Sequence, residues 1–142
     1  MRNRSVKIVI AAIALLRAAP AAAQVQRVKD TVHNLSASGP GRIRASSETE
    51  VCIFCHTPHG AGNVRPLWNR SVPAGAYVIY RSSSLRADVG QPTGTSKLCL
   101  SCHDGTIALG SVLSRPSPIA FAGGGDRIPP GSTNLGTDLS DD

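Results

Sequence analysis

The sequence predicts a single small domain that is mostly irregular and loop-rich, with a few short α-helices. The chain of 142 residues has the length of one domain. Its 14 glycines and 10 prolines interrupt helices and strands, and no long amphipathic pattern follows residue 23. The aromatic residues are one Trp, two Tyr and two Phe, so a conventional apolar core would be thin. Something other than the protein's own side chains is therefore expected to supply buried apolar mass.

Residues 1–23 are interpreted as a secretory signal peptide. A basic start precedes a short apolar run from Ile8 to Leu16, and small residues then lead to an expected cleavage site after Ala23. The apolar run is well short of the ~20 residues that a membrane-spanning helix needs. We therefore expect a periplasmic or extracellular protein, with no stable membrane span after cleavage.

The basic character of the chain belongs partly to this signal. Its removal takes four of the 15 Lys and Arg residues and none of the nine acidic residues, which lowers the formal charge from +6 to +2. A nucleic-acid partner is not expected, because that function calls for a clustered basic face.

Two short helices are predicted. Ser47 and Glu50 fit a capping box, which predicts a helix from about Glu48 to His56. Thr95 or Ser96 is expected to cap a second helix that ends at His103, since Gly105 suits a helix stop. The rest is expected to be irregular: residues 36–46, residues 57–94 apart from a brief strand over 76–81, and a loop-rich tail over 116–142.

All four cysteines belong to two Cys-x-x-Cys-His motifs, Cys52–His56 and Cys99–His103. Cysteines three residues apart lie near one face of a helical turn, so both can form thioethers with the vinyl groups of one haem. The next residue then places its imidazole where it can bind the iron, and its second ring nitrogen is expected to donate to a carbonyl or carboxylate. The motifs thus predict two covalently attached c-type haems, held by Cys52, Cys55, Cys99 and Cys102 and ligated by His56 and His103.

Three other uses of four cysteines remain as less favoured alternatives. Two Cys-x-x-Cys pairs can form a structural zinc site, and an even number of cysteines in a secreted chain can form disulfides. A thioredoxin-like redox site is the third, although the βαβ pattern that it requires is absent. Export, together with a histidine directly after both pairs, favours haem attachment.

Two further histidines, His33 and His59, match the two remaining axial positions. Methionine ligation is not expected, because Met1 is the only methionine and it lies in the signal peptide. Bis-histidine haems of low potential are therefore favoured. His59 is too close in sequence to His56 to reach the far side of the same haem, so it would ligate the second haem or a haem of another subunit. By elimination His33 would serve the first haem, although spacing leaves both pairings open.

Several charged residues have two candidate roles. Lys97, Arg65, Arg70 and Arg81 are candidates for pairing with haem propionates. For each of them a solvated surface charge is the more common role. Asp104 is either a hydrogen-bond acceptor for His103 or a helix-end residue.

Four segments together resemble bacterial multihaem c-type cytochromes, and more narrowly the group described by doubled CxxCH motifs. They are His33–Ser36, Val51–Gly60, Pro66–Arg70 and Ser96–Thr106. The resemblance covers about residues 30–142, and Cys-x-x-Cys-His-Thr-Pro-His-Gly is its most specific part. It implies a small dihaem cytochrome c domain over 24–142, organised around closely spaced, mainly bis-histidine haems with His33 and His59 as ligand candidates. In the family the tail segment usually continues into a His-Pro pair that this chain lacks, so a truncated tail and a lost ligand both remain open.

The resemblance implies electron transfer to and from redox partner proteins, without enzymatic activity of its own. No general acid or base stands out in the sequence. Two alternatives remain open. The chain is a subunit of a larger multihaem complex or filament, formed with other cytochromes or by self-assembly, or it is a haem enzyme or sensor with one open axial site.

Overall fold

A computed structural model describes residues 27–62 and 65–140, so the predicted signal peptide at 1–23 lies outside the described residues. The described part is mostly irregular, as the sequence predicted, with one α-helix, three short 3-10 helices and one two-stranded sheet. In chain order its elements are η1 (Val28–Asp30), η2 (Val51–Phe54), β1 (Val78–Ile79), α2 (Gly94–His103), η3 (Ala122–Gly124) and β2 (Asp138–Leu139).

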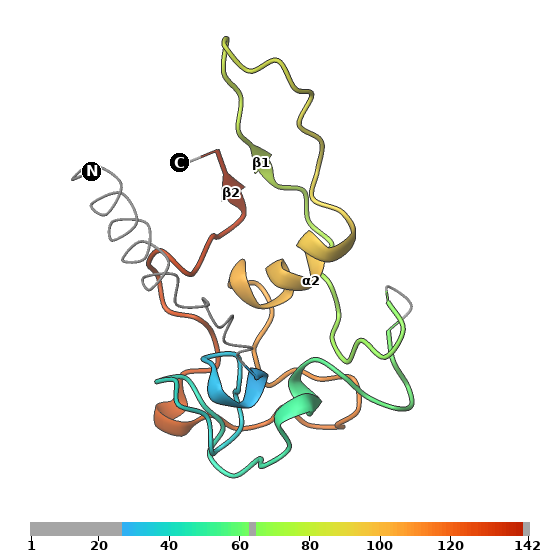
Figure 1. Ribbon diagram of the computed structural model, residues 1–142, viewed down its shortest axis with the longest axis vertical. Helices are drawn as coiled ribbons and strands as arrows, with labels where there is room; N and C mark the ends of the chain where they lie inside the picture. Colours follow the sequence, from blue (N-terminus) through green and yellow to red (C-terminus); the bar gives the residue numbers. More distant parts are fainter. Residues whose placement is uncertain (1–26, 63–64, 141–142) are drawn as a thin grey trace, which may run out of the picture.

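Helix α2 lies between a body of loops on one side and an extended arm on the other (Figure 1). The arm leaves the body after β1, turns back and returns to the start of α2 (Figure 1). Its base is closed by Gln91, whose side-chain amide both accepts from the Tyr77 backbone N–H at 2.8 Å and donates to the Tyr77 carbonyl at 2.8 Å.

Strands β1 and β2 form a parallel pair in which Val78 is opposite Asp138 and Ile79 is opposite Leu139. The brief strand predicted over 76–81 is thus confirmed over two of its residues. The pairing carries the C-terminal part of the chain back to the base of the arm, beside α2.

The first predicted helix is shorter than the sequence suggested, and its capping box is wrong. Instead of a helix from Glu48 to His56, η2 covers only Val51–Phe54 and begins after Glu50, which has no side-chain cap. The Glu48 carboxylate takes the place expected for Ser47, because it accepts from the Glu50 backbone N–H at 2.9 Å. The helix then ends because the backbone of Cys55 leaves helical geometry.

The second helix is confirmed, with an earlier start. Helix α2 begins after Thr93, which makes no side-chain capping bond, so neither Thr95 nor Ser96 is the cap. It ends at His103, and Gly105 follows at a φ of +71°. A left-handed residue directly beyond the helix favours glycine, which is the predicted reason for the stop.

The apolar core is small, as the composition indicated. Phe54 and Phe121 pack edge to face with ring centroids 6.0 Å apart. Phe121 belongs to the tail, which is loop-rich as predicted but contributes to the core. The buried core residues are Ala45, Ile53, Phe54, Leu109 and Phe121.

Buried polar side chains hold the loops where regular secondary structure is missing. The Asn69 amide donates to the Ile53 carbonyl at 2.6 Å and to the Ser114 hydroxyl at 2.7 Å, and its oxygen accepts from the Ser114 backbone N–H at 2.9 Å. Asn69 is fully buried. A buried amide with all these partners fixes both segments, because leaving any of its polar groups unpaired would be costly.

Candidate functional site

An apolar groove of about 360 Å³ borders the core and brings the two Cys-x-x-Cys-His motifs together. Cys55 of the first motif and Cys102 of the second both line it, and both pack against the core residues. The lining residues come from five separate parts of the chain: Val32, His33, Leu35, Gly41, Arg42, Ile43, Phe54, Cys55, Cys102, His103, Leu109, Ile128 and Thr133.

His103 is held at this groove by the tail of the chain. Its Nδ1 lies 2.7 Å from the carbonyl oxygen of Thr133, so Nδ1 carries the proton and donates. The neighbouring Leu135 backbone N–H donates to the His103 carbonyl at 2.7 Å. The hydrogen bond that the sequence analysis expected for a ligating histidine is therefore present at His103, and Nε2 is left free to bind a metal.

His33 lines the same groove as His103. Their ring centroids are 6.2 Å apart and their planes are inclined at 57°. Two imidazoles that bind opposite sides of one metal ion, each at a metal–nitrogen distance of about 2 Å, have ring centres about 6 Å apart. The structure therefore brings His33 to the second motif, whereas elimination from the sequence had paired it with the first.

The residue after His33 explains how a loop can hold the imidazole there. Asn34 is buried, and its side-chain oxygen accepts from both the backbone N–H and the hydroxyl of Ser36. Its amide nitrogen donates to the Lys29 carbonyl at 2.8 Å. These bonds form a closed turn around Asn34, and His33 projects from its edge into the groove lining.

The first motif is built differently. His56 is exposed, and its ring meets the edge of Trp68 with centroids 6.4 Å apart and planes at 86°. The two residues also form an antiparallel bridge between the motif and the segment that follows it. Trp68 Nε1 is buried and has no hydrogen-bond partner among the described residues. A hydrogen-bond donor is therefore available next to His56.

His59 is exposed and is not part of the groove lining. It sits in a tight turn in which the Thr57 hydroxyl donates to the His59 carbonyl at 2.7 Å. The turn keeps His59 close to the first motif along the chain. Of the four predicted site histidines, the structure therefore brings two together with Cys55 and Cys102. His33 and His103 share the groove, while His56 and His59 are not part of its lining.

All four cysteines lie in the described part of the chain, and all are free of disulfides. Cys52 and Cys99 are exposed, whereas burial raises the pKa of both Cys55 and Cys102 above the usual thiol value. Within residues 27–62 and 65–140, no group of three or more His, Cys, Asp or Glu side chains is arranged to hold a bare metal ion.

The four candidates for propionate pairing lie in different surroundings. Arg65 and Arg81 are exposed, which is consistent with solvated surface charges. The Lys97 ammonium donates to the Pro73 carbonyl at 3.0 Å. Arg70 is not a surface charge: it is fully buried, with its guanidinium on backbone carbonyls.

Sequence reasoning missed two groups that the groove contains. Arg42 is exposed and lines the groove together with both histidines, which makes it a better placed cation for a carboxylate than the four residues considered above. The Thr133 carbonyl was missed because a backbone acceptor has no residue signature. Arg42 carried a weak signal, since it stands in the loop that leads back from His33 to the core.

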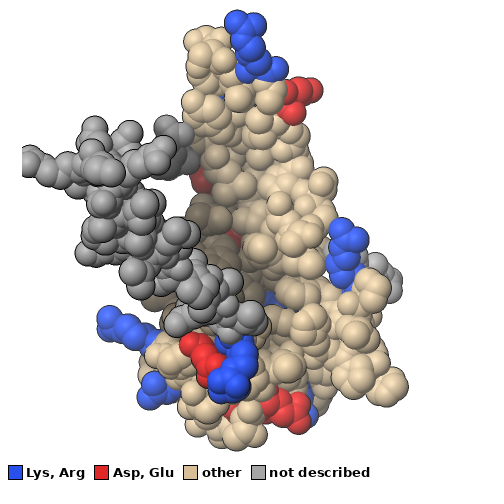
Figure 2. Space-filling view, viewed as in Figure 1, with Lys and Arg blue, Asp and Glu red and all other residues tan. Residues whose placement is uncertain are grey.

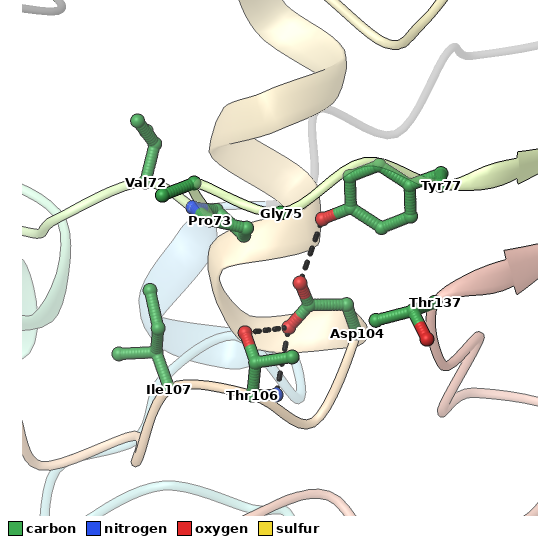
Figure 3. A pocket seen from close by; sticks show the side chains of 9 residues that line it. Val72, Pro73, Gly75, Tyr77, Asp104, Thr106, Ile107 and Thr137 are labelled. Carbon is green, nitrogen blue, oxygen red and sulfur yellow. Dashed lines mark hydrogen bonds between the residues drawn. The ribbon is translucent and has the colours of Figure 1, made fainter.

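Asp104 is a helix-end residue, which decides between its two predicted roles. The Tyr77 hydroxyl donates to one of its oxygens at 2.7 Å, and the other accepts from the Thr106 backbone N–H and hydroxyl, both at 2.8 Å (Figure 3). Its carboxylate therefore fixes the turn after α2 against the base of the arm, beside a second cavity of about 270 Å³. Burial, followed by this hydrogen bond, raises the pKa of Tyr77 far above its usual value.

Charged side chains are spread out on the face shown in Figure 2. Lys and Arg side chains lie apart from one another, at the arm, at the side of the body and at its lower edge, with Asp and Glu among them. Within the described residues, no helix has the length and hydropathy of a membrane span.

Comparisons with known proteins add no relative. No protein-family model matches the chain, and no curated protein matches it. The functional argument therefore rests on the two motifs and on the geometry of the groove.

Proposed function

We propose that this protein is a dihaem c-type cytochrome that transfers electrons in the periplasm or outside the cell. The observation that carries the proposal is the groove itself. It brings a cysteine from each motif to one apolar wall and sets His33 at 6.2 Å from His103.

The donor set of the groove fits a haem. A porphyrin is a large apolar disc, and the lining is mainly apolar, with a few polar side chains among aliphatic residues and Phe54. The exposed Arg42 at that edge suits the carboxylates of a haem. Each haem, when bound, supplies an iron that exchanges one electron.

The residues of the second motif have definite tasks in this proposal. Cys99 and Cys102 would attach the group, and His103 would bind its iron through Nε2, because Nδ1 is engaged by Thr133. His33 would be the second histidine to bind that iron. A site held by two imidazoles would exclude other ligands, which suits a carrier and not a site that binds substrate.

Among the described residues, the first motif would hold its haem through Cys52, Cys55 and one histidine, His56. The buried Trp68 Nε1 is a donor for a carboxylate next to this site. His59 is exposed and free to ligate a haem of a second chain, which is the specific observation in favour of self-assembly as a second candidate function.

Partner proteins and location follow from the same proposal. Haem attachment to Cys-x-x-Cys-His motifs takes place after export, which agrees with the predicted signal peptide. The protein's partners would be redox proteins, because holding and tuning the cofactors is all that its residues need to do.

The test is the haem content of the chain exported to a periplasm that attaches c-type haem. Denatured protein should retain two haems per chain, measured by the pyridine haemochrome spectrum and by intact mass. The double variant Cys52→Ala/Cys55→Ala serves as the control and should retain one. Wild-type protein that is exported and folded but carries no covalent haem would overturn the proposal.

A further inference from the structure

Arg70 is the most deeply buried charged residue of the described chain, with no exposed surface. Its Nη1 donates to the Leu109 carbonyl at 2.6 Å, and its Nη2 donates to the Ser101 carbonyl at 2.9 Å and to the Ala108 carbonyl at 3.0 Å. Its Nε has no partner among the described residues. The guanidinium is therefore held rigidly, but only by neutral groups.

The residue stands between the two motifs. Ser101 is the residue before Cys102, so the guanidinium is bonded into the second motif itself. The preceding residue, Asn69, is bonded into the first: its backbone N–H donates to the Cys55 carbonyl at 3.0 Å and its side chain to the Ile53 carbonyl. The Asn69–Arg70 pair thus ties both motifs together from one point.

No carboxylate in the described part of the chain forms a salt bridge with Arg70. A buried, uncompensated charge is costly, and its field reaches its neighbours with little screening by solvent or salt. The guanidinium lies against the second motif through the Ser101 carbonyl, and Asn69 joins the same backbone to the Cys55 carbonyl of the first, so both motifs are within reach of its field.

We propose that Arg70 is a positioning residue whose buried positive charge raises the reduction potentials of both haems together. This inference rests on the proposed function. When an iron is reduced it takes one electron from an external donor and passes from the ferric to the ferrous state, which removes one positive charge and moves no atom. A fixed cation nearby disfavours the more positive, ferric state, so it favours reduction of either haem.

The experiment is a spectroelectrochemical titration of the purified holoprotein and three variants. Arg70→Gln removes the charge while retaining a hydrogen-bond donor, and Arg70→Lys retains the charge. Arg115→Gln is the matched control, since it removes a positive charge from an exposed ion pair with Glu48. Each iron takes its electron from the electrode through mediators.

In Arg70→Gln we expect both potentials to fall, with about a tenfold change in the ratio of oxidised to reduced iron at a given potential, or about 59 mV for a one-electron couple. Arg70→Lys at pH 6 should keep both potentials near the wild-type values. Arg115→Gln should change the ratio less than twofold. The inference would be overturned if, in Arg70→Gln, the ratio of oxidised to reduced iron at a given potential changes less than twofold. A shift of the potential of one haem alone would overturn it too.

If Arg70→Gln does not accumulate with two haems, the pH dependence of Arg70→Lys decides. A buried lysine loses its proton at a lower pH than a free one. Both potentials of this variant should then fall with rising pH more steeply than in wild type, and an unchanged slope counts against the inference. Wild-type protein without haem overturns the proposed function, whereas two haems with unshifted potentials overturn this inference alone.

Discussion

The two Cys-x-x-Cys-His motifs have the same chemistry but lie in different surroundings. The second motif forms the end of the ten-residue helix α2, and its histidine is fixed from behind by the Thr133 carbonyl and faced by His33. The first motif begins inside the four-residue helix η2 and ends beyond it, and its histidine is exposed, with its ring perpendicular to that of Trp68.

For the proposed haems, this difference means that the motif alone would not define both axial ligands. Attachment needs only two cysteines and the next residue, all close in sequence. Closing the sixth position needs a second imidazole that a distant loop must hold in place, here through the buried Asn34 turn. We therefore expect a closed second haem and a first haem whose sixth position depends on other molecules.

Removal of either cysteine pair should have the largest effect. Cys99→Ala/Cys102→Ala and Cys52→Ala/Cys55→Ala should each lower the haem content from two to about one per chain, because each pair attaches its own haem. The visible spectra should then differ: the haem that remains after loss of the first pair is low-spin, and the one that remains after loss of the second pair is open. Identical spectra for the two variants would contradict the comparison.

The axial assignment is tested by a pair of histidine variants. His33→Ala should open the second haem, so that reduced protein binds CO at both haems instead of one. His59→Ala is the matched control, and in dilute, monomeric protein it should leave CO binding unchanged. The difference spectrum with and without CO measures both, and a gain of CO binding in His59→Ala but not in His33→Ala would reverse the assignment.

The side-chain hydrogen bonds that hold the two motifs in place should contribute unequally to the free energy of unfolding. Asn69→Ala removes three buried hydrogen bonds behind the first motif, and we expect a loss of about 2–3 kcal/mol in the free energy of unfolding. Tyr77→Phe removes one bond behind the second motif, with a loss of about 1 kcal/mol. Denaturant titrations followed by circular dichroism measure both, and a larger loss for Tyr77→Phe would show that the supports are ranked wrongly.

The smallest effect concerns the entry to the first motif. The Glu50 backbone N–H, with a further contribution from Arg115, lowers the pKa of Glu48 below its usual value of 4.5. A lowered folded-state pKa means that Glu48 stabilises the fold above pH ~4.5 and that this contribution is lost as the pH falls through the folded value. Glu48→Gln should therefore cost less than about 1 kcal/mol at pH 7, where the carboxylate is partly solvated.

The same variant at pH 2.5 should be as stable as the wild type, because Glu48 is then protonated in both states. Thermal unfolding at the two pH values provides the measurement. An equal loss of stability at both would mean that packing of the side chain matters, and its charge does not.

The sequence was sufficient for those features that depend on neighbouring residues. The paired motifs, the Gly105 stop, the brief strand and the loop-rich character all come from short patterns or composition. The capping of the first helix failed because two oxygens competed for one amide, and the longer side chain of Glu48 took it. Local pattern cannot rank such competitors.

Features that depend on contacts between distant segments were out of reach. From the sequence, Arg70 could not be distinguished from a surface charge. Its guanidinium is buried because it donates to the carbonyls of Ser101, Ala108 and Leu109, which are more than 30 residues away along the chain. His33 could be matched with either motif, because it lies 70 positions before His103 and no periodic pattern fixes the distance between them. The sequence of the tail likewise contains no pattern that predicts the hydrogen bond between the Thr133 carbonyl and His103.

The most direct test of the account is a CO titration of the reduced, wild-type holoprotein at a dilution where it is monomeric. The account predicts that one of the two haems binds CO and that the other, held between His33 and His103, does not. Protein in which neither haem binds CO would contradict it, because His59 or another group would then close the first site within the chain. Protein in which both haems bind CO would contradict the pairing of His33 with His103.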